Sequence, residues 1–140
     1  MTSIEISNIK DLIKNGQCLL AHKKINELIN KEPHNLSYKN LLAFIYLNQK
    51  KYDDSIIVLK NIIKHSSNFI DAYVNLGNIY NNLNQLQDAE TNFKHAISII
   101  PNHSLALNNL ANIYNKQNKH KEASEIYSQL IKNNPNNLDL

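Results

Sequence analysis

A single spacing recurs along the whole chain. Tyr46, Tyr80 and Tyr114 are 34 residues apart, and Pro101 and Pro135 are separated by the same interval. A period that fixes both an aromatic residue of the buried type and a helix-stopping proline predicts a small unit stacked on copies of itself. A stack of this kind has an extended surface, and extended surfaces usually bind rather than catalyse.

The chain divides into four blocks of 34 residues, which begin at Thr2, Leu36, Ile70 and Ser104. Within each block apolar residues recur at intervals of three and four, the spacing of one helical face. Small residues occupy the eighth and twentieth positions of most blocks, where two helix axes must approach closely. Each block is therefore predicted to form two amphipathic helices, over residues 4–14 and 18–31, 36–48 and 52–65, 70–82 and 86–99, and 104–116 and 120–133.

The third block carries the clearest motif, DAYVNLGNIYNNLNQLQDAETNFKHAISIIP, and it resembles the tetratricopeptide repeat. The fourth block is similar, and the second has Ser67 in place of the proline and Ser55 in place of an alanine. The first block departs most, because Asn8 replaces a leucine and its first helix is expected to be short. The resemblance implies an all-α, right-handed superhelical α-solenoid of four helix-turn-helix units, forming one domain over 1–140 with repeats at about 2–35, 36–69, 70–103 and 104–137.

The composition narrows the class of partner. All 15 basic residues are lysines, scattered along the chain, and the net charge is +3. A nucleic-acid-binding protein would be expected to concentrate its basic residues, and no run of about 18 apolar residues predicts a membrane span. The single cysteine, Cys18, fits a reducing compartment. We therefore expect a cytoplasmic protein that binds neither nucleic acid nor membrane.

Catalytic motifs are missing from the sequence. The six histidines form no HExxH motif or other paired spacing of a metal site, and no glycine-rich phosphate loop is present. Nothing places a histidine beside Cys18 as a base. The sequence predicts no enzyme, no cofactor and no metal, and the expected partner is a protein or peptide.

Asparagine is concentrated where the resemblance places the concave face. In this family the first helix of each pair lines that face, and in the third and fourth blocks most of the implied positions are asparagine. The other implied positions of these blocks are Asp71, Val74, Leu105 and Lys116. The asparagines at the implied positions are Asn75, Asn78, Asn81, Asn82, Asn108, Asn109, Asn112 and Asn115, and all of them except Asn81 are predicted to bind the peptide.

The asparagine amide suits the recognition of an extended chain. It offers two N–H donors and one accepting carbonyl, which match the acceptor and donor of a peptide unit. Asn75 and Asn109 stand in NLG and NLA motifs that resemble the asparagine ladder of the O-linked N-acetylglucosamine transferases. That resemblance implies recognition of a polypeptide through its main chain. The alternative is that exposed helix faces in a chain with 25 asparagines simply collect asparagine.

The second block does not continue this ladder. It offers Asn40 and Phe44, with Leu41 and Leu47 beside them. These residues predict an apolar patch on the same face, which would hold one hydrophobic anchor of the bound segment. The alternative is that Phe44 and Leu47 pack within the stack.

The last helix suggests a different use of the chain. Repeat stacks usually need a polar helix over their terminal apolar surface. We therefore expect the face of the last helix to be incompletely covered at Ile126, Tyr127, Leu130 and Ile131. The sequence thus predicts a scaffold that binds an extended peptide. The alternatives are a module that self-associates through its terminal helices, giving a homo-oligomer, and a substrate-recognition arm that serves a glycosyltransferase in trans.

Overall fold

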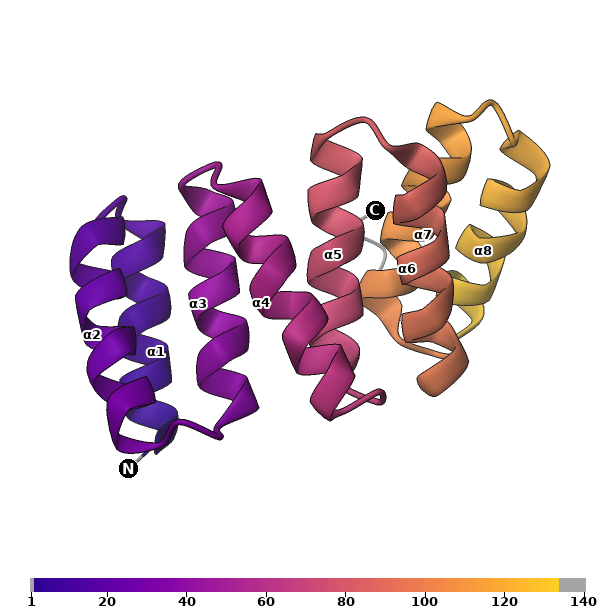
Figure 1. The fold of residues 1–140 in the computed structure, drawn as a ribbon. Coiled ribbons are helices and arrows are strands. Elements are labelled where there is room, and N and C mark those ends of the chain that lie inside the picture. Colours follow the sequence, from indigo (N-terminus) through magenta and orange to yellow (C-terminus); the bar gives the residue numbers. More distant parts are fainter. Residues whose placement is uncertain (1, 134–140) are drawn as a thin grey trace. The chain divides into compact units, whose positions relative to one another are not determined.

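The computed structural model describes residues 2–133, and these form eight helices and no strand. Figure 1 shows the helices in chain order. The helices are α1 (Thr2–Lys14), α2 (Cys18–Lys31), α3 (Leu36–Asn48), α4 (Tyr52–His65), α5 (Ile70–Asn82), α6 (Leu86–Ile99), α7 (Ser104–Lys116) and α8 (His120–Asn133).

The predicted helix boundaries are confirmed for seven of the eight helices. The exception is α1, which begins at Thr2 and has 13 residues, the same length as α3, α5 and α7. The expectation of a short first helix was therefore wrong. The substitution of Asn8 for a leucine does not shorten α1, because Asn8 is exposed on a helix whose buried side is formed by Ile9 and Ile13.

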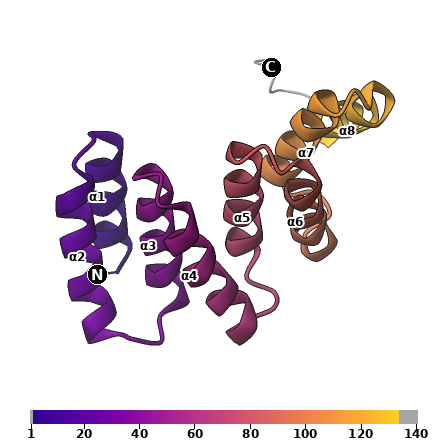
Figure 2. The ribbon, with the colours of Figure 1, turned by 45° about the horizontal axis from the view of Figure 1, so that its top comes forward.

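The chain forms two compact units, residues 1–67 with α1 to α4 and residues 68–140 with α5 to α8. In unit 1, α1 packs on α2 and α3, α2 on α3, and α3 on α4. In unit 2, α5 packs on α6 and α7, α6 on α7, and α7 on α8. Figure 2 shows the paired helices of each unit lying side by side. The prediction of one domain over 1–140 stays a prediction.

Each unit has its own apolar core. The core of unit 1 surrounds Ile9, Ile25, Tyr38 and Ile45, all 1 % exposed or less. The core of unit 2 surrounds Phe93, Leu110, Ile113 and Tyr114. Burial of each large apolar side chain contributes about 1.5–3 kcal/mol. These residues come from both helices of a pair and from the following helix, so the stacking of pairs builds the core.

Two positions set how closely the helices of a pair approach. In unit 2 a Cβ atom added to Gly77 on α5 would lie 2.5 Å from the Phe93 ring on α6, so only glycine fits against this ring. The same two block positions hold Ala43 with Leu59 in unit 1, both fully buried. In these two pairs a larger residue on one helix is matched by a smaller one on the other, as close packing requires, whereas in the first pair both positions hold isoleucine, Ile9 and Ile25.

The turn inside each pair uses one residue with positive φ. These residues recur every 34 positions: Gly16, Lys50, Asn84 and Asn118, with φ values of 73°, 58°, 57° and 60°. In each turn the following residue donates its N–H to a carbonyl near the end of the first helix; Lys119 N, for example, lies 2.8 Å from Tyr114 O. This is the left-handed helix end that glycine and asparagine adopt most easily. The turn reverses the chain and places the second helix of the pair.

A buried carboxylate joins α6 to the turn after α7. Glu90 is 4 % exposed, and its oxygens lie 2.7 Å from Lys94 Nζ and 3.2 Å from Lys119 Nζ. Both ammonium groups also lie over the Tyr114 ring of α7, at 5.8 and 5.3 Å from its centre. Burial alone raises the pKa of the Glu90 carboxyl, but hydrogen bonds from Lys94, Gln117 and Lys119 outweigh it and hold the pKa below its ordinary value.

We predict that Gly77→Ala destabilises unit 2 and that a second substitution restores it. The added methyl group overpacks the Phe93 contact at a cost of about 1–3 kcal/mol, more than the roughly 1 kcal/mol that alanine gains in a helix. Adding Phe93→Leu reproduces the alanine–leucine pair of Ala43 and Leu59. Urea unfolding should therefore find the double variant more stable than Gly77→Ala alone. If the two effects simply add, the close-approach explanation is wrong.

A second prediction concerns the Glu90 cluster. The pKa of Glu90 is lower in the folded than in the unfolded protein. Its carboxylate therefore stabilises the fold fully at a pH above the unfolded-state pKa, and this stabilisation is lost as the pH falls through the folded-state pKa. Glu90→Gln should lower the free energy of unfolding by about 2 kcal/mol at neutral pH, and by much less in acid, once the pH has fallen below the folded pKa and the native carboxyl is protonated too. The matched control is Glu125→Gln, an exposed carboxyl on α8. A loss for Glu90→Gln that is equal at both pH values would contradict the assignment.

Candidate functional site

Unit 2 carries the asparagines of the third and fourth blocks on two neighbouring helices. α5 and α7 contact each other directly. Asn109 of α7 donates its amide N–H to the carbonyl of Asn78 on α5, with Nδ2 and Oδ1 at 2.9 Å. Both side chains are half-buried. The two helices are therefore joined at their surface by a pair of side-chain amides.

Three more asparagines of this surface make side-chain contacts. Lys116 Nζ donates to Asn81 Oδ1 at 2.7 Å, and the Tyr127 hydroxyl of α8 donates to Asn112 Oδ1 at 2.9 Å. Asn115 Oδ1 lies 3.5 Å from Nδ1 of His120. We call the surface formed by these five asparagines and Lys116 the amide face; it comprises Asn78, Asn81, Asn109, Asn112, Asn115 and Lys116.

The amide face lies on helices that the core holds in place. The opposite side of α7 is buried through Leu107, Leu110 and Ile113. The first turn of α7 is capped by His103, whose Nδ1 accepts from the N–H of Ala106 at 3.2 Å. Side chains on rigid, packed helices hold their positions better than side chains on loops. The amides are thus oriented before any partner arrives.

The other predicted asparagines of unit 2 lie on the same two helices. Asn75 and Asn108 are half-buried, and Asn82 is exposed. Asn82 and Asn108 make no side-chain hydrogen bond with any residue that the structure describes. Val74, which the family pattern also placed on the concave face, is 4 % exposed and belongs to the core. That assignment was wrong, because Val74 lies on the side of α5 that packs against α6 and α7.

Asn40 and Phe44 belong to α3 in unit 1 and are not part of the amide face. Asn40 is half-buried, and Phe44 is 36 % exposed. Leu41, expected in the same apolar patch, is 5 % exposed and lies in the core of unit 1. The predicted patch is therefore reduced to Phe44 and the half-buried Leu47.

The contacts of Lys116, Tyr127 and His120 were not predicted from the sequence. Their partners lie 35, 15 and 5 residues away. The pair Asn78 and Asn109 is separated by 31 residues, and Asn81 and Lys116 by 35. These two separations bracket the repeat length, so a search for polar residues about one repeat apart could have found both pairs.

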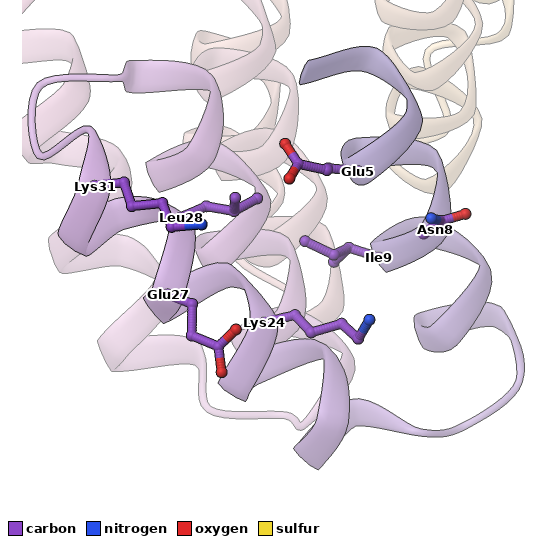
Figure 3. A pocket seen from close by; sticks show the side chains of 7 residues that line it. All are labelled: Glu5, Asn8, Ile9, Lys24, Glu27, Leu28 and Lys31. Atoms are coloured by element: carbon purple, nitrogen blue, oxygen red, sulfur yellow. The ribbon is translucent and has the colours of Figure 1, made fainter. Parts of the chain in front are cut away.

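A separate pocket lies between α1 and α2 in unit 1, and Figure 3 shows its side chains. The buried residues Ile9 and Leu28 line it together with charged residues of both signs and one asparagine. The lining residues are Glu5, Asn8, Ile9, Lys24, Glu27, Leu28 and Lys31.

The register of the repeat suggests why this pocket is open. Glu5 and Glu27 occupy the block positions that hold Tyr73 and His95 in unit 2, where the two rings stack with their centres 5.3 Å apart. Two carboxylates repel each other, whereas two aromatic rings attract and fill space. The polar groups of the pocket are all at least partly exposed to water.

Two other classes of feature, a metal cluster and a membrane-spanning helix, do not occur in the described part of the chain. Residues 2–133 contain no group of three or more histidine, cysteine, aspartate or glutamate side chains that could hold a metal ion. None of the described helices combines the length and apolar character needed to cross a bilayer.

Comparison with known proteins identifies the repeat. Residues 68–135 match the family model of the tetratricopeptide repeat. Among solved structures, a thermophilic tetratricopeptide-repeat protein from Thermus thermophilus is similar, with a TM-score of 0.86, 18 % identity, and coverage of 96 % of this chain and 75 % of that chain. A crystal structure of MamA has a TM-score of 0.74 and 21 % identity, covering 91 % and 74 % of the two chains.

A second MamA structure, from Desulfovibrio magneticus, has a TM-score of 0.75 and 18 % identity, covering 91 % of this chain and 72 % of that chain. No curated protein matches the sequence. At these identities the structural matches define the fold, and they confirm the predicted all-α solenoid class. Residues 68–135 thus match the tetratricopeptide repeat, and the chain has the helical-repeat fold seen in a tetratricopeptide-repeat protein.

Proposed function

We propose that the protein is a scaffold that binds an extended polypeptide on the amide face of unit 2. A tetratricopeptide-repeat fold suggests a protein-interaction scaffold, and proteins built of these repeats are generally not enzymes. The observation that carries the finer proposal is the hydrogen bond between Asn78 and Asn109, which aligns two amides on adjacent helices. The single cysteine favours a cytoplasmic location.

The chemistry of the amide face supports recognition of a main chain. Each amide can donate to a peptide carbonyl or accept from a peptide N–H. One such hydrogen bond contributes about 0.5–1.5 kcal/mol net, so several must act together. Because the asparagines are already held by one another and by Lys116 and Tyr127, less side-chain freedom is lost on binding. Asn75, Asn82 and Asn108 extend the face along the same helices.

A second candidate function is self-association through α8. The equivalent residues Ile29 and Ile97 pack against the cores of their units, whereas Ile131 at the same block position is 55 % exposed. The rest of the expected apolar surface is covered, because Leu130 is 8 % exposed and Ile126 and Tyr127 pack against the core. The observation therefore favours a small contact centred on Ile131.

The third hypothesis, a recognition arm for a glycosyltransferase, depends on the same asparagines. It differs from the main proposal by adding an enzyme, a glycosyltransferase that would act on the bound peptide. Finding such an enzyme encoded beside this protein would favour it.

The main proposal is tested by removing four amides together. Replacing Asn75, Asn78, Asn109 and Asn112 by alanine should weaken the binding of peptides selected from a random displayed library by about 30-fold, the effect of losing four hydrogen bonds of roughly 0.5 kcal/mol each. Circular dichroism should show the helices intact. The matched control replaces Asn26, Asn30, Asn61 and Asn92, which lie on the second helices of their pairs. Unchanged affinity in the first variant would dismiss the amide face as the binding site.

Self-association is tested by sedimentation velocity at high micromolar concentration. The wild type should form a dimer, and Ile131→Glu should remain a monomer because a charge replaces the exposed apolar group. Ile57→Glu is the control, since Ile57 is 67 % exposed on α4 of unit 1. A wild type that sediments as a monomer, or an equal effect of both variants, would count against α8 as the contact.

A further inference from the structure

We infer that the amide face selects a partner segment rich in carboxylates, an acidic peptide. This inference rests on the proposed function and deepens it, because it names the chemistry of the peptide. It follows from which atoms of the asparagine amides are already used inside the protein and which are left to meet a ligand.

The carbonyl oxygens of the amide face are largely engaged within unit 2. Asn78 Oδ1 accepts from Asn109, Asn81 Oδ1 from Lys116, and Asn112 Oδ1 from the Tyr127 hydroxyl. Asn115 Oδ1 faces a ring nitrogen of His120 at 3.5 Å. Three of the five asparagines thus direct their acceptor at an internal donor, and Asn115 does so in the His120 tautomer that carries its proton on Nδ1. The lysine contact fixes this polarity at Asn81, since an ammonium group can only donate.

The N–H groups of the same asparagines are left for other partners. None of these four contacts uses the NH₂ group of Asn78, Asn81, Asn112 or Asn115. Each of these NH₂ groups carries two donors. The face therefore presents more donors than acceptors, and it suits a ligand that presents more acceptors than donors. A carboxylate is such a ligand, because its two oxygens only accept.

The charge on the face agrees with this polarity. Lys116 is exposed, and its ammonium is hydrogen-bonded to Asn81. Within the described residues the carboxylate contacts of lysine are those of Lys94 and Lys119 with Glu90, so the charge of Lys116 is not neutralised by an ion pair. Hydrogen bonds from an ammonium to a carboxylate are about twice as strong as those between neutral groups.

Acidic groups of unit 2 do not cancel this charge. Asp71 is in the first turn of α5, ten residues before Asn81, so about 15 Å separates them along the helix axis. That distance exceeds the Debye length of about 8 Å at physiological salt. Glu90 is committed to its own two lysines. Glu122, in the first turn of α8, is the acid nearest to Lys116 in sequence, and it forms no ion pair with a lysine among the described residues.

The same polarity does not favour a nucleic acid. Phosphate binding draws its affinity from several cations that act together, and the amide face has one lysine, while the sequence has no arginine. Neutral N–H donors with a single ammonium are better matched to spaced carboxylates on a peptide. The occupant we infer is therefore a polypeptide segment with alternating acidic residues.

The experiment compares two isosteric probes. A capped peptide of about eight residues that alternates serine with glutamate is titrated into the 15N-labelled protein, beside the same peptide with glutamine for glutamate. We expect the side-chain NH₂ signals of Asn78, Asn81 and Asn112 to shift, and the glutamate peptide to bind about tenfold more tightly. Lys116→Gln should reduce this preference to about twofold or less. Lys132→Gln, at the far end of α8, should leave it unchanged.

The possible outcomes distinguish the acidic preference from the proposed peptide binding and from the binding of a nucleic acid. Equal affinities for the two peptides, with the amide signals still shifting, would overturn the acidic preference and leave the proposed function standing. No shift of these signals with either peptide, or with library-selected peptides, would overturn both. If an oligothymidylate binds more tightly than the glutamate peptide, the inferred acidic peptide is wrong and the ligand of the amide face is a nucleic acid.

Discussion

The close approach of α5 and α6 is the constraint on which unit 2 depends. At Gly77 the backbone of α5 lies against the Phe93 ring, with no room for a Cβ atom between them. The ring belongs to a core to which all four helices of unit 2, α5 to α8, contribute residues. A pair held at this distance presents a continuous apolar side to the next helix, and the next pair buries it. Stacking follows from this contact, and so does the placement of α5 and α7 as neighbours.

α7 connects the core of unit 2 to the amide face. One side of the helix buries Leu110, Ile113 and Tyr114, and the other carries Asn109 and Asn112. The buried side is held further by Lys94 and Lys119 over the Tyr114 ring, with Glu90 between them. A charged cluster at this point costs desolvation, but three donors satisfy the carboxylate. The orientation of the amides is thus a consequence of packing on the opposite side of the same helix.

The two units use the same repeat positions for different chemistry. Position for position, the aromatic stack of Tyr73 and His95 in unit 2 corresponds to the carboxylates Glu5 and Glu27 at the pocket of unit 1. The asparagines on the first helices of unit 2 correspond in unit 1 to a mixture that includes Asn40 and Phe44. The repeated backbone sets the positions of the side chains but not the residue types at those positions. Adjacent repeats with the same backbone can therefore have chemically different surfaces.

The sequence by itself determined the repeat, the boundaries of α2 to α8 and the small residues at the close approach of α5 and α6, because these obey local rules of periodicity, turns and side-chain size. It also placed Asn78, Asn109 and Asn112 on two first helices. The tertiary structure decided that Val74 and Leu41 are core residues and that Asn109 donates to Asn78. It also decided that Lys116 donates a hydrogen bond to the side-chain carbonyl of Asn81, and Tyr127 to that of Asn112. These outcomes depend on the axial offset and rotation between neighbouring helices, and that offset is set by how whole helices pack rather than by any local run of residues.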